Sequence, residues 1–128
     1  MARILVIDDD EAVSRTVEII LGANGFEVIT APDGKAGISA VKEQSFDLVI
    51  VDLFMPGMDG LETTKAIHKA DPRVPIITAS GFMFSGPCPE MPNFQAMAVD
   101  AGATSAVYKP FRPKELVHAV QKALGVAA

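Results

Sequence analysis

Polar side chains that suit phosphate and metal chemistry follow four short apolar runs of this 128-residue chain. Three consecutive acids follow the first run, and an acid, a hydroxyl and an amine follow the later ones. These residues are Asp8, Asp9 and Asp10, then Asp52, then Ser80, and finally Lys109. If the runs are parallel strands of one open sheet, their carboxyl ends meet at the edge where such sheets bind ligands. We therefore expect these side chains to converge on one rim.

Crowded carboxylates repel one another unless a cation lies between them. Mg²⁺ prefers hard oxygen ligands, keeps several waters and binds through one or two carboxylates together with substrate phosphate. A hydroxyl and an ammonium group opposite the ion would stabilise phosphoryl oxygens, and a carboxylate that is not tightly bound to metal can act as a nucleophile. The pattern therefore predicts Mg²⁺-dependent phosphoryl transfer to an aspartate.

The elements that must position these residues alternate between two periodicities. Continuous apolar runs, typical of strands with both faces covered, lie at Ile4–Ile7, Phe46–Val51, Val74–Ala79 and Ala106–Tyr108, and the partly polar run Glu27–Thr30 is typical of an edge strand. Helical spacing is found from Val13 to Leu21 with Gly25 as a stop, and over Gly34–Gln44, Leu61–Ala70, Phe94–Ala101 and Lys114–Leu124. Five such alternations predict an α/β protein with a parallel sheet and helices on both faces.

Composition restricts the function classes. The length predicts a single domain over residues 1–128. A net charge of −5 disfavours binding to nucleic acid or to an anionic membrane surface. The single cysteine fits a reducing compartment. Because no apolar run has the length of a membrane span or the form of a signal peptide, we expect a cytoplasmic protein without membrane insertion.

Four motifs carry a resemblance to a known family: Ile4–Asp9, Asp47–Gly60, Pro75–Gly81 and Lys109–Phe111. In this order and spacing the chain resembles, over essentially its whole length, the receiver domain of two-component response regulators. The resemblance implies a flavodoxin-like (βα)5 three-layer sandwich with sheet order 2-1-3-4-5, in agreement with the alternation of elements. It also implies a phosphoacceptor switch rather than a dedicated enzyme.

The resemblance also implies roles for individual residues. Asp52 would accept a phosphoryl group from a phosphohistidine on a sensor histidine kinase or a histidine phosphotransfer protein. Asp9 would bind Mg²⁺ directly, Asp8 mostly through water, and Asp52 and the backbone carbonyl of Phe54 would be further ligands. Asp10 is expected to cap the helix that follows it.

Two further residues would contact the phosphoryl group, the hydroxyl of Ser80 and the amine of Lys109. Thr78 is the alternative hydroxyl, because the period of a strand places it on the same face as Ser80. Ser80 followed by Gly81 matches the family pattern, whereas Thr78 matches only if the strand ends two residues earlier. We therefore favour Ser80. The Asp59-Gly60 pair is interpreted as turn chemistry that shapes the loop after Asp52.

The chain departs from the family pattern at two places. Many receivers carry an aromatic residue three positions before the lysine, where this chain has Ala106, and Tyr108 is the aromatic residue on the same face of the strand. The segment Gly81–Asn93 is longer, richer in proline and more apolar than usual. It predicts a distinct surface for a downstream protein partner over Gly81–Tyr108, the alternative being an insertion without a role.

Three other functions are disfavoured by particular residues of the sequence. An aspartyl-phosphate phosphohydrolase usually carries an acid two residues after its nucleophile, where this chain has Phe54. A flavin mononucleotide carrier needs a glycine- and hydroxyl-rich loop after the first strand, where this chain has acids. A degenerate receiver that serves only as a scaffold would not need the complete residue set. Only Gly125–Ala128 follow the last helix, so the chain is either a stand-alone regulator or an excised receiver of a longer protein. Because Met1 lies close to the first predicted strand, we expect the stand-alone form.

Overall fold

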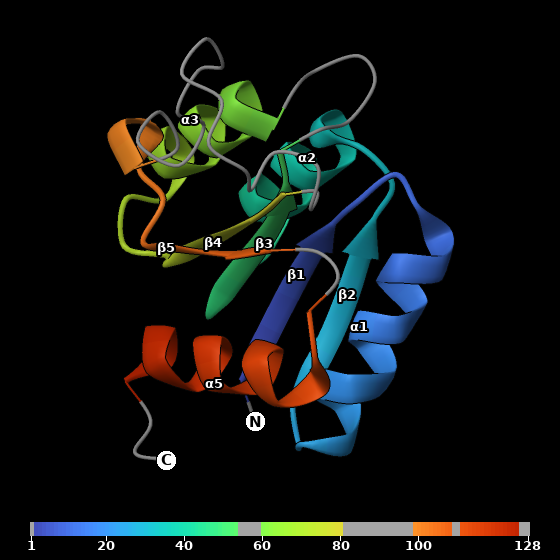
Figure 1. The fold of residues 1–128 in the computed structure, drawn as a ribbon. Coiled ribbons are helices and arrows are strands. Elements are labelled where there is room, and N and C mark those ends of the chain that lie inside the picture. Colours follow the sequence, from blue (N-terminus) through green and yellow to red (C-terminus); the bar gives the residue numbers. More distant parts are fainter. Residues whose placement is uncertain (1, 54–59, 81–98, 109–110, 126–128) are drawn as a thin grey trace, which may run out of the picture.

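A computed structural model describes residues 2–53, 60–80, 99–108 and 111–125. Its five strands are β1 (Arg3–Ile7), β2 (Glu27–Ala31), β3 (Leu48–Asp52), β4 (Ile76–Ser80) and β5 (Ser105–Tyr108). They form one parallel sheet in the order β2-β1-β3-β4-β5 (Figure 1). The predicted fold class and strand order are therefore confirmed, and the partly polar run is the edge strand β2.

Among the described residues, four complete helices cover the two faces of the sheet. They are α1 (Glu11–Ala23), α2 (Gly34–Glu43), α3 (Gly60–Ala70) and α5 (Pro113–Leu124). The helices α1 and α5 lie against one face, and α2 and α3 lie against the other (Figure 1). Of the helix predicted over Phe94–Ala101, only residues 99–101 are described, and they are helical. The other predicted boundaries differ from the observed ones by about one or two residues, the usual uncertainty at element ends.

The core consists of two apolar layers, one on each face of the sheet. Along β1, Ile4 and Val6 belong to the layer under α1 and α5, whereas Leu5 and Ile7 belong to the layer under α2 and α3. All four side chains are at most 2% exposed. A central strand that is buried on both faces has no solvent-exposed face that would carry polar residues, which explains why its sequence is a continuous apolar run.

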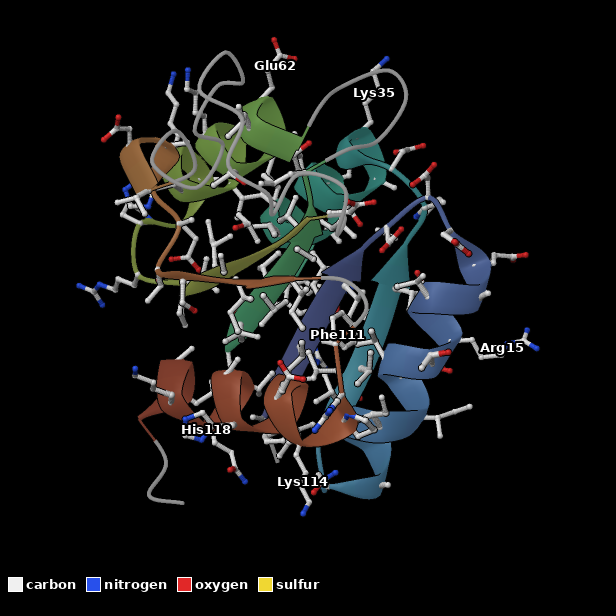
Figure 2. All side chains as sticks on the ribbon, viewed as in Figure 1. Arg15, Lys35, Glu62, Phe111, Lys114 and His118 are labelled. Carbon is white, nitrogen blue, oxygen red and sulfur yellow. The ribbon has the colours of Figure 1, made fainter. Side chains whose placement is uncertain are left out.

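The outer faces of the helices are mainly polar, although Ile19 on α1 is 64% exposed. Figure 2 shows Arg15 on α1, Lys35 on α2 and Lys114 on α5 pointing away from the sheet, whereas Phe111 lies in the space between the sheet and α5. In the part of the chain that the structure describes, no helix combines the length and the apolar character that crossing a membrane requires.

Candidate functional site

Three carboxylates meet at the carboxyl edge of the sheet. Asp8 and Asp9 directly follow β1, and Asp52 is the last residue of β3. One carboxylate oxygen from each lies within 4.8 Å of the others. Because β1 and β3 are neighbours, with Ile7 paired to Val51, the next residue after each member of this pair, Asp8 and Asp52, is an acid of the cluster. Strand register therefore brings together acids that are more than forty residues apart in the chain.

The neighbouring acids differ in their hydrogen bonds. Asp10 is the N-cap of α1, and its Oδ1 accepts hydrogen bonds from the backbone N–H groups of Ala12 at 2.9 Å and Val13 at 3.4 Å. The Oδ1 atom of Asp8 accepts one from the backbone N–H of Asp10 at 2.9 Å. The expected capping role of Asp10 is present, and the carboxylate of Asp8 is held by the same turn.

The donor set fits a hard divalent cation. Asp8 and Asp52 are 5% and 6% exposed, whereas Asp9 is exposed. Buried carboxylates at this spacing repel one another strongly, because the low dielectric of the interior does not screen them as water does. A cation with carboxylate and water ligands relieves that repulsion, and the exposed side at Asp9 leaves room for waters and a phosphate. The three residues therefore suit Mg²⁺ in charge, ligand type and access.

The strand β4 places Ser80 at its carboxyl end, beside the end of β3. Asp52 is paired with Ala79, and Ser80 with Tyr108 of β5. Thr78 lies two residues inside the strand, paired with Val51 and Ala106. The condition under which Thr78 would occupy the strand end, a β4 two residues shorter, is thus not met.

Several predicted site residues lie outside the described residues. They are Lys109, Phe54 and the whole loop Gly81–Asn93, together with the side chains of Ser80 and Tyr108. The strand β5 ends at Tyr108, the residue directly before Lys109. Phe111 packs against the core layer of α1 and α5. The described residues on either side of positions 109 and 110 therefore belong to the sheet and to the packed core.

Sequence reasoning missed the part that Gly60 plays at this site. It is the first residue of α3 and is buried. A Cβ built on it would overlap the carbonyl oxygen of Asp52 and the Cα of Leu53. The helix therefore begins in direct contact with the backbone of Asp52. The Asp59-Gly60 pair predicts only a turn, and nothing in a single sequence marks which backbone a glycine will touch.

Replacing Thr78 with Val is expected to raise the free energy of unfolding by about 1 kcal/mol. The hydroxyl of Thr78 is buried and, among the described residues, has no hydrogen-bond partner, so the isosteric change removes a desolvation penalty. Urea unfolding measures the effect. The matched control is Thr64→Val, expected to lower stability because the Thr64 hydroxyl donates a hydrogen bond to the Gly60 carbonyl oxygen at 2.7 Å. A destabilised Thr78→Val protein would contradict the expectation.

Comparison with known proteins agrees with this geometry. The family model of the response regulator receiver domain matches residues 4–121. The chain is 36% identical over 122 residues to the DNA-binding response regulator MtrA of Mycolicibacterium smegmatis, covering 95% of this chain and 50% of that protein. It is 35% identical to the chemotaxis protein CheY of Bacillus subtilis, covering 95% of this chain and 97% of that protein.

Solved structures show the same relationship. The chemotaxis protein CheY4 of Vibrio cholerae superposes with a TM-score of 0.84 at 30% identity, covering 96% of this chain and 98% of that one. A CheY-like receiver domain protein of Methanospirillum hungatei gives a TM-score of 0.87 at 27% identity, covering 98% and 94%. The chain spans about half the length of the MtrA relatives that it matches. It belongs to the family of response regulator receiver domains, whose members are phosphorylation-dependent switches in two-component signalling.

Proposed function

We propose that the carboxylate of Asp52 accepts a phosphoryl group from a phosphohistidine of a sensor histidine kinase or a histidine phosphotransfer protein. The reaction depends on Mg²⁺, and the phosphorylated chain signals through changed binding to a downstream protein. The observation that carries the proposal is the cluster of Asp8, Asp9 and Asp52, whose carboxylate oxygens lie within 4.8 Å of one another.

Asp52 is the best placed of the three acids to act as the nucleophile. It ends a central strand and is nearly buried, and the next peptide N–H, that of Leu53, donates to the carbonyl oxygen of Ala79 on β4 at 2.9 Å. Its backbone is therefore fixed, as a reacting group requires. Asp8 and Asp9 follow the end of β1, where Asp8 accepts a hydrogen bond from the turn into α1 and Asp9 is exposed.

In the transfer step, a carboxylate oxygen of Asp52 attacks the phosphorus atom of the donor. A phosphorus–oxygen bond forms, the phosphorus–nitrogen bond of the phosphohistidine breaks, and the electron pair leaves with the imidazole nitrogen, which takes up a proton if it leaves as the anion. Asp8, Asp9 and the carbonyl of Phe54 would hold Mg²⁺, which supplies neutralisation of charge on the phosphoryl oxygens. Ser80 and Lys109 would donate hydrogen bonds to those same oxygens.

The remaining parts of the proposal concern the whole chain. We propose that residues 1–128 form one receiver domain and that the protein is a cytoplasmic, stand-alone regulator. It contacts its downstream partner through Gly81–Tyr108. It neither binds nucleic acid directly nor enters a membrane. The Bacillus subtilis CheY chain, of which this chain covers 97%, represents the stand-alone form. The MtrA relatives, which are about twice as long, represent the alternative of a receiver within a longer protein. We further propose that the chain is not a dedicated enzyme, its own phosphorylation and dephosphorylation aside.

A small-molecule phosphoryl donor tests the function without a known kinase. The chain is incubated with acetyl phosphate, with phosphoramidate or with neither, in Mg²⁺ or in a chelator, and its intact mass is followed. We expect a gain of one phosphoryl group only when a donor and Mg²⁺ are both present. No gain with either donor would contradict the proposal and favour the scaffold alternative.

Replacing Ser80 with Ala is expected to slow phosphoryl uptake about tenfold, because one charge-assisted hydrogen bond to the transferred group is lost. Thr78→Val is the matched hydroxyl control and is expected to react at the parent rate, since Thr78 lies inside the strand. The time course of intact mass with acetyl phosphate and Mg²⁺ provides the comparison. A slow Thr78→Val protein beside a normal Ser80→Ala protein would reverse the assignment.

A further inference from the structure

The start of α3 touches the main chain of the proposed phosphoacceptor. A Cβ on Gly60 would overlap the Asp52 carbonyl oxygen and the Leu53 Cα, and would lie 2.9 Å from the Asp52 carbonyl carbon. These neighbours are backbone atoms, which cannot rotate away as the end of a long side chain can. Only a residue without a side chain allows the helix to begin this close to the strand end.

The residue after Asp52, Leu53, is held by hydrogen bonds through both its N–H and its carbonyl oxygen. On the sheet side, the N–H of Leu53 donates to the Ala79 carbonyl oxygen at 2.9 Å. On the helix side, the N–H of Gly60 donates to the Leu53 carbonyl oxygen at 3.2 Å. The first bond holds the Asp52–Leu53 peptide itself, and the second ties the start of α3 to the carbonyl of the same Leu53. The direction in which the side chain of Asp52 leaves the backbone depends on the Asp52–Leu53 peptide, so the position of the α3 start bears on where the carboxylate lies.

The first turn of α3 is held in place by a side-chain hydrogen bond and by apolar packing. The hydroxyl of Thr64 donates to the Gly60 carbonyl oxygen at 2.7 Å, and Thr64 is completely buried. Leu53 and Leu61 pack in one small apolar cluster with Ala103. The contact between Gly60 and the Asp52 backbone is therefore part of a packed junction.

We propose that Gly60 is a positioning residue for phosphoryl transfer, acting through the backbone of Asp52, an inference that rests on the function proposed above. A methyl group at position 60 forces the helix start and the Asp52–Leu53 peptide apart by about 1 Å. A displacement of that size at a reacting group lowers a rate by on the order of 10²-fold. Because Gly60 faces the main chain of Asp52 and Leu53, we expect the maximal rate to fall while the donor concentration giving half that rate stays unchanged.

The chain offers two matched glycine controls. Gly37 on α2 is also buried and also lacks room for a Cβ, but the atoms in the way are side-chain carbons of Ile7. Gly37→Ala therefore perturbs packing on the same face of the sheet without touching the Asp52 backbone. Gly22 on α1 is exposed, and a Cβ there would meet nothing within 4 Å. Gly22→Ala reports any general effect of exchanging a helical glycine.

The experiment measures phosphoryl uptake from acetyl phosphate at saturating Mg²⁺ for the parent and the Ala variants at positions 60, 37 and 22. Circular dichroism first establishes a temperature at which each protein is folded. We expect Gly60→Ala to be on the order of 10²-fold slower at saturating donor, with the other two within about threefold of the parent. If Gly60→Ala is as fast as Gly37→Ala, the positioning role is wrong although Asp52 is phosphorylated. If the parent takes up no phosphoryl group, the proposed function itself is wrong.

A second pair of variants decides the matter if Gly60→Ala does not fold. Thr64→Val removes the hydrogen bond to the Gly60 carbonyl oxygen, whereas Thr64→Ser keeps it. We expect the maximal rate to fall severalfold in Thr64→Val and to be restored in Thr64→Ser. Equal rates in the two variants would overturn the proposal. They would show that losing the hydrogen bond to the Gly60 carbonyl oxygen does not affect phosphoryl transfer at Asp52.

Discussion

Replacing Asp52 with Asn is expected to lower the rate of phosphoryl uptake by about 10³-fold or more, the scale on which loss of a catalytic nucleophile is felt. The amide has nearly the shape of the carboxylate but lacks its charge and its nucleophilic oxygen. The change also removes one of three clustered negative charges, so the variant is expected to fold at least as stably as the parent without metal. Intact mass after incubation with acetyl phosphate and Mg²⁺ gives the rate.

Asp10→Asn is the control for this variant. It removes a charge from the same rim, yet Asn caps a helix as well as Asp does, so α1 keeps its N-cap. We expect Asp10→Asn to take up a phosphoryl group at close to the parent rate. Equal labelling of Asp52→Asn and the parent would exclude Asp52 as the nucleophile.

Replacing Asp9 with Asn is expected to weaken Mg²⁺ binding about 100-fold, because a carboxylate ligand becomes a neutral one. Binding to the folded state alone stabilises it by RT ln(1 + [L]/Kd), or about 2.7 kcal/mol when the metal concentration is 100 times Kd. At a Mg²⁺ concentration chosen in that way for the parent, Asp9→Asn is expected to lose nearly all of this stabilisation. Thermal unfolding with and without Mg²⁺ measures the difference.

Asp10→Asn is also the control for the metal experiment, because it distinguishes the loss of a metal ligand from the loss of a nearby negative charge. Asp10 carries the same charge next to Asp9, but its carboxylate is bonded to the first turn of α1. Asp10→Asn is therefore expected to retain most of the Mg²⁺-induced stabilisation. If Asp9→Asn retains it as well, Asp9 is not a ligand, and if both variants lose it, the effect is one of general charge.

The fold was predictable because its strands are buried on both faces. The run Ile4–Ile7 is apolar at every position, and the structure divides it between two core layers. The alternation with helices then implies a parallel sheet, and parallel strands direct their carboxyl ends to one edge. The meeting of Asp8 and Asp9 with Asp52 follows from those steps together with the pairing of β1 and β3.

The details that escaped prediction depend on distances between elements. The contact of Gly60 with the Asp52 backbone is set by how closely α3 approaches β3, and no local pattern encodes that approach. The isolation of the Thr78 hydroxyl is likewise a property of the packed interior. In the sequence, Thr78 and Ser80 are both hydroxyl residues on the same face of one predicted strand, two positions apart. Which of them lies at the strand end depends on where β4 ends, and the structure ends it at Ser80.

The most direct test of the central claim identifies the atom that carries the phosphoryl group. Asp52 is also part of the metal cluster, so loss of activity in a variant does not by itself distinguish the nucleophile from a ligand. Borohydride reduces an acyl phosphate to an alcohol and thereby converts a phosphorylated aspartate to homoserine. After reaction of the parent chain with acetyl phosphate and Mg²⁺, peptide mass spectrometry is expected to find homoserine at position 52 alone. Homoserine at position 8 or 9, or a phosphorylated chain with no homoserine at all, would contradict the assignment.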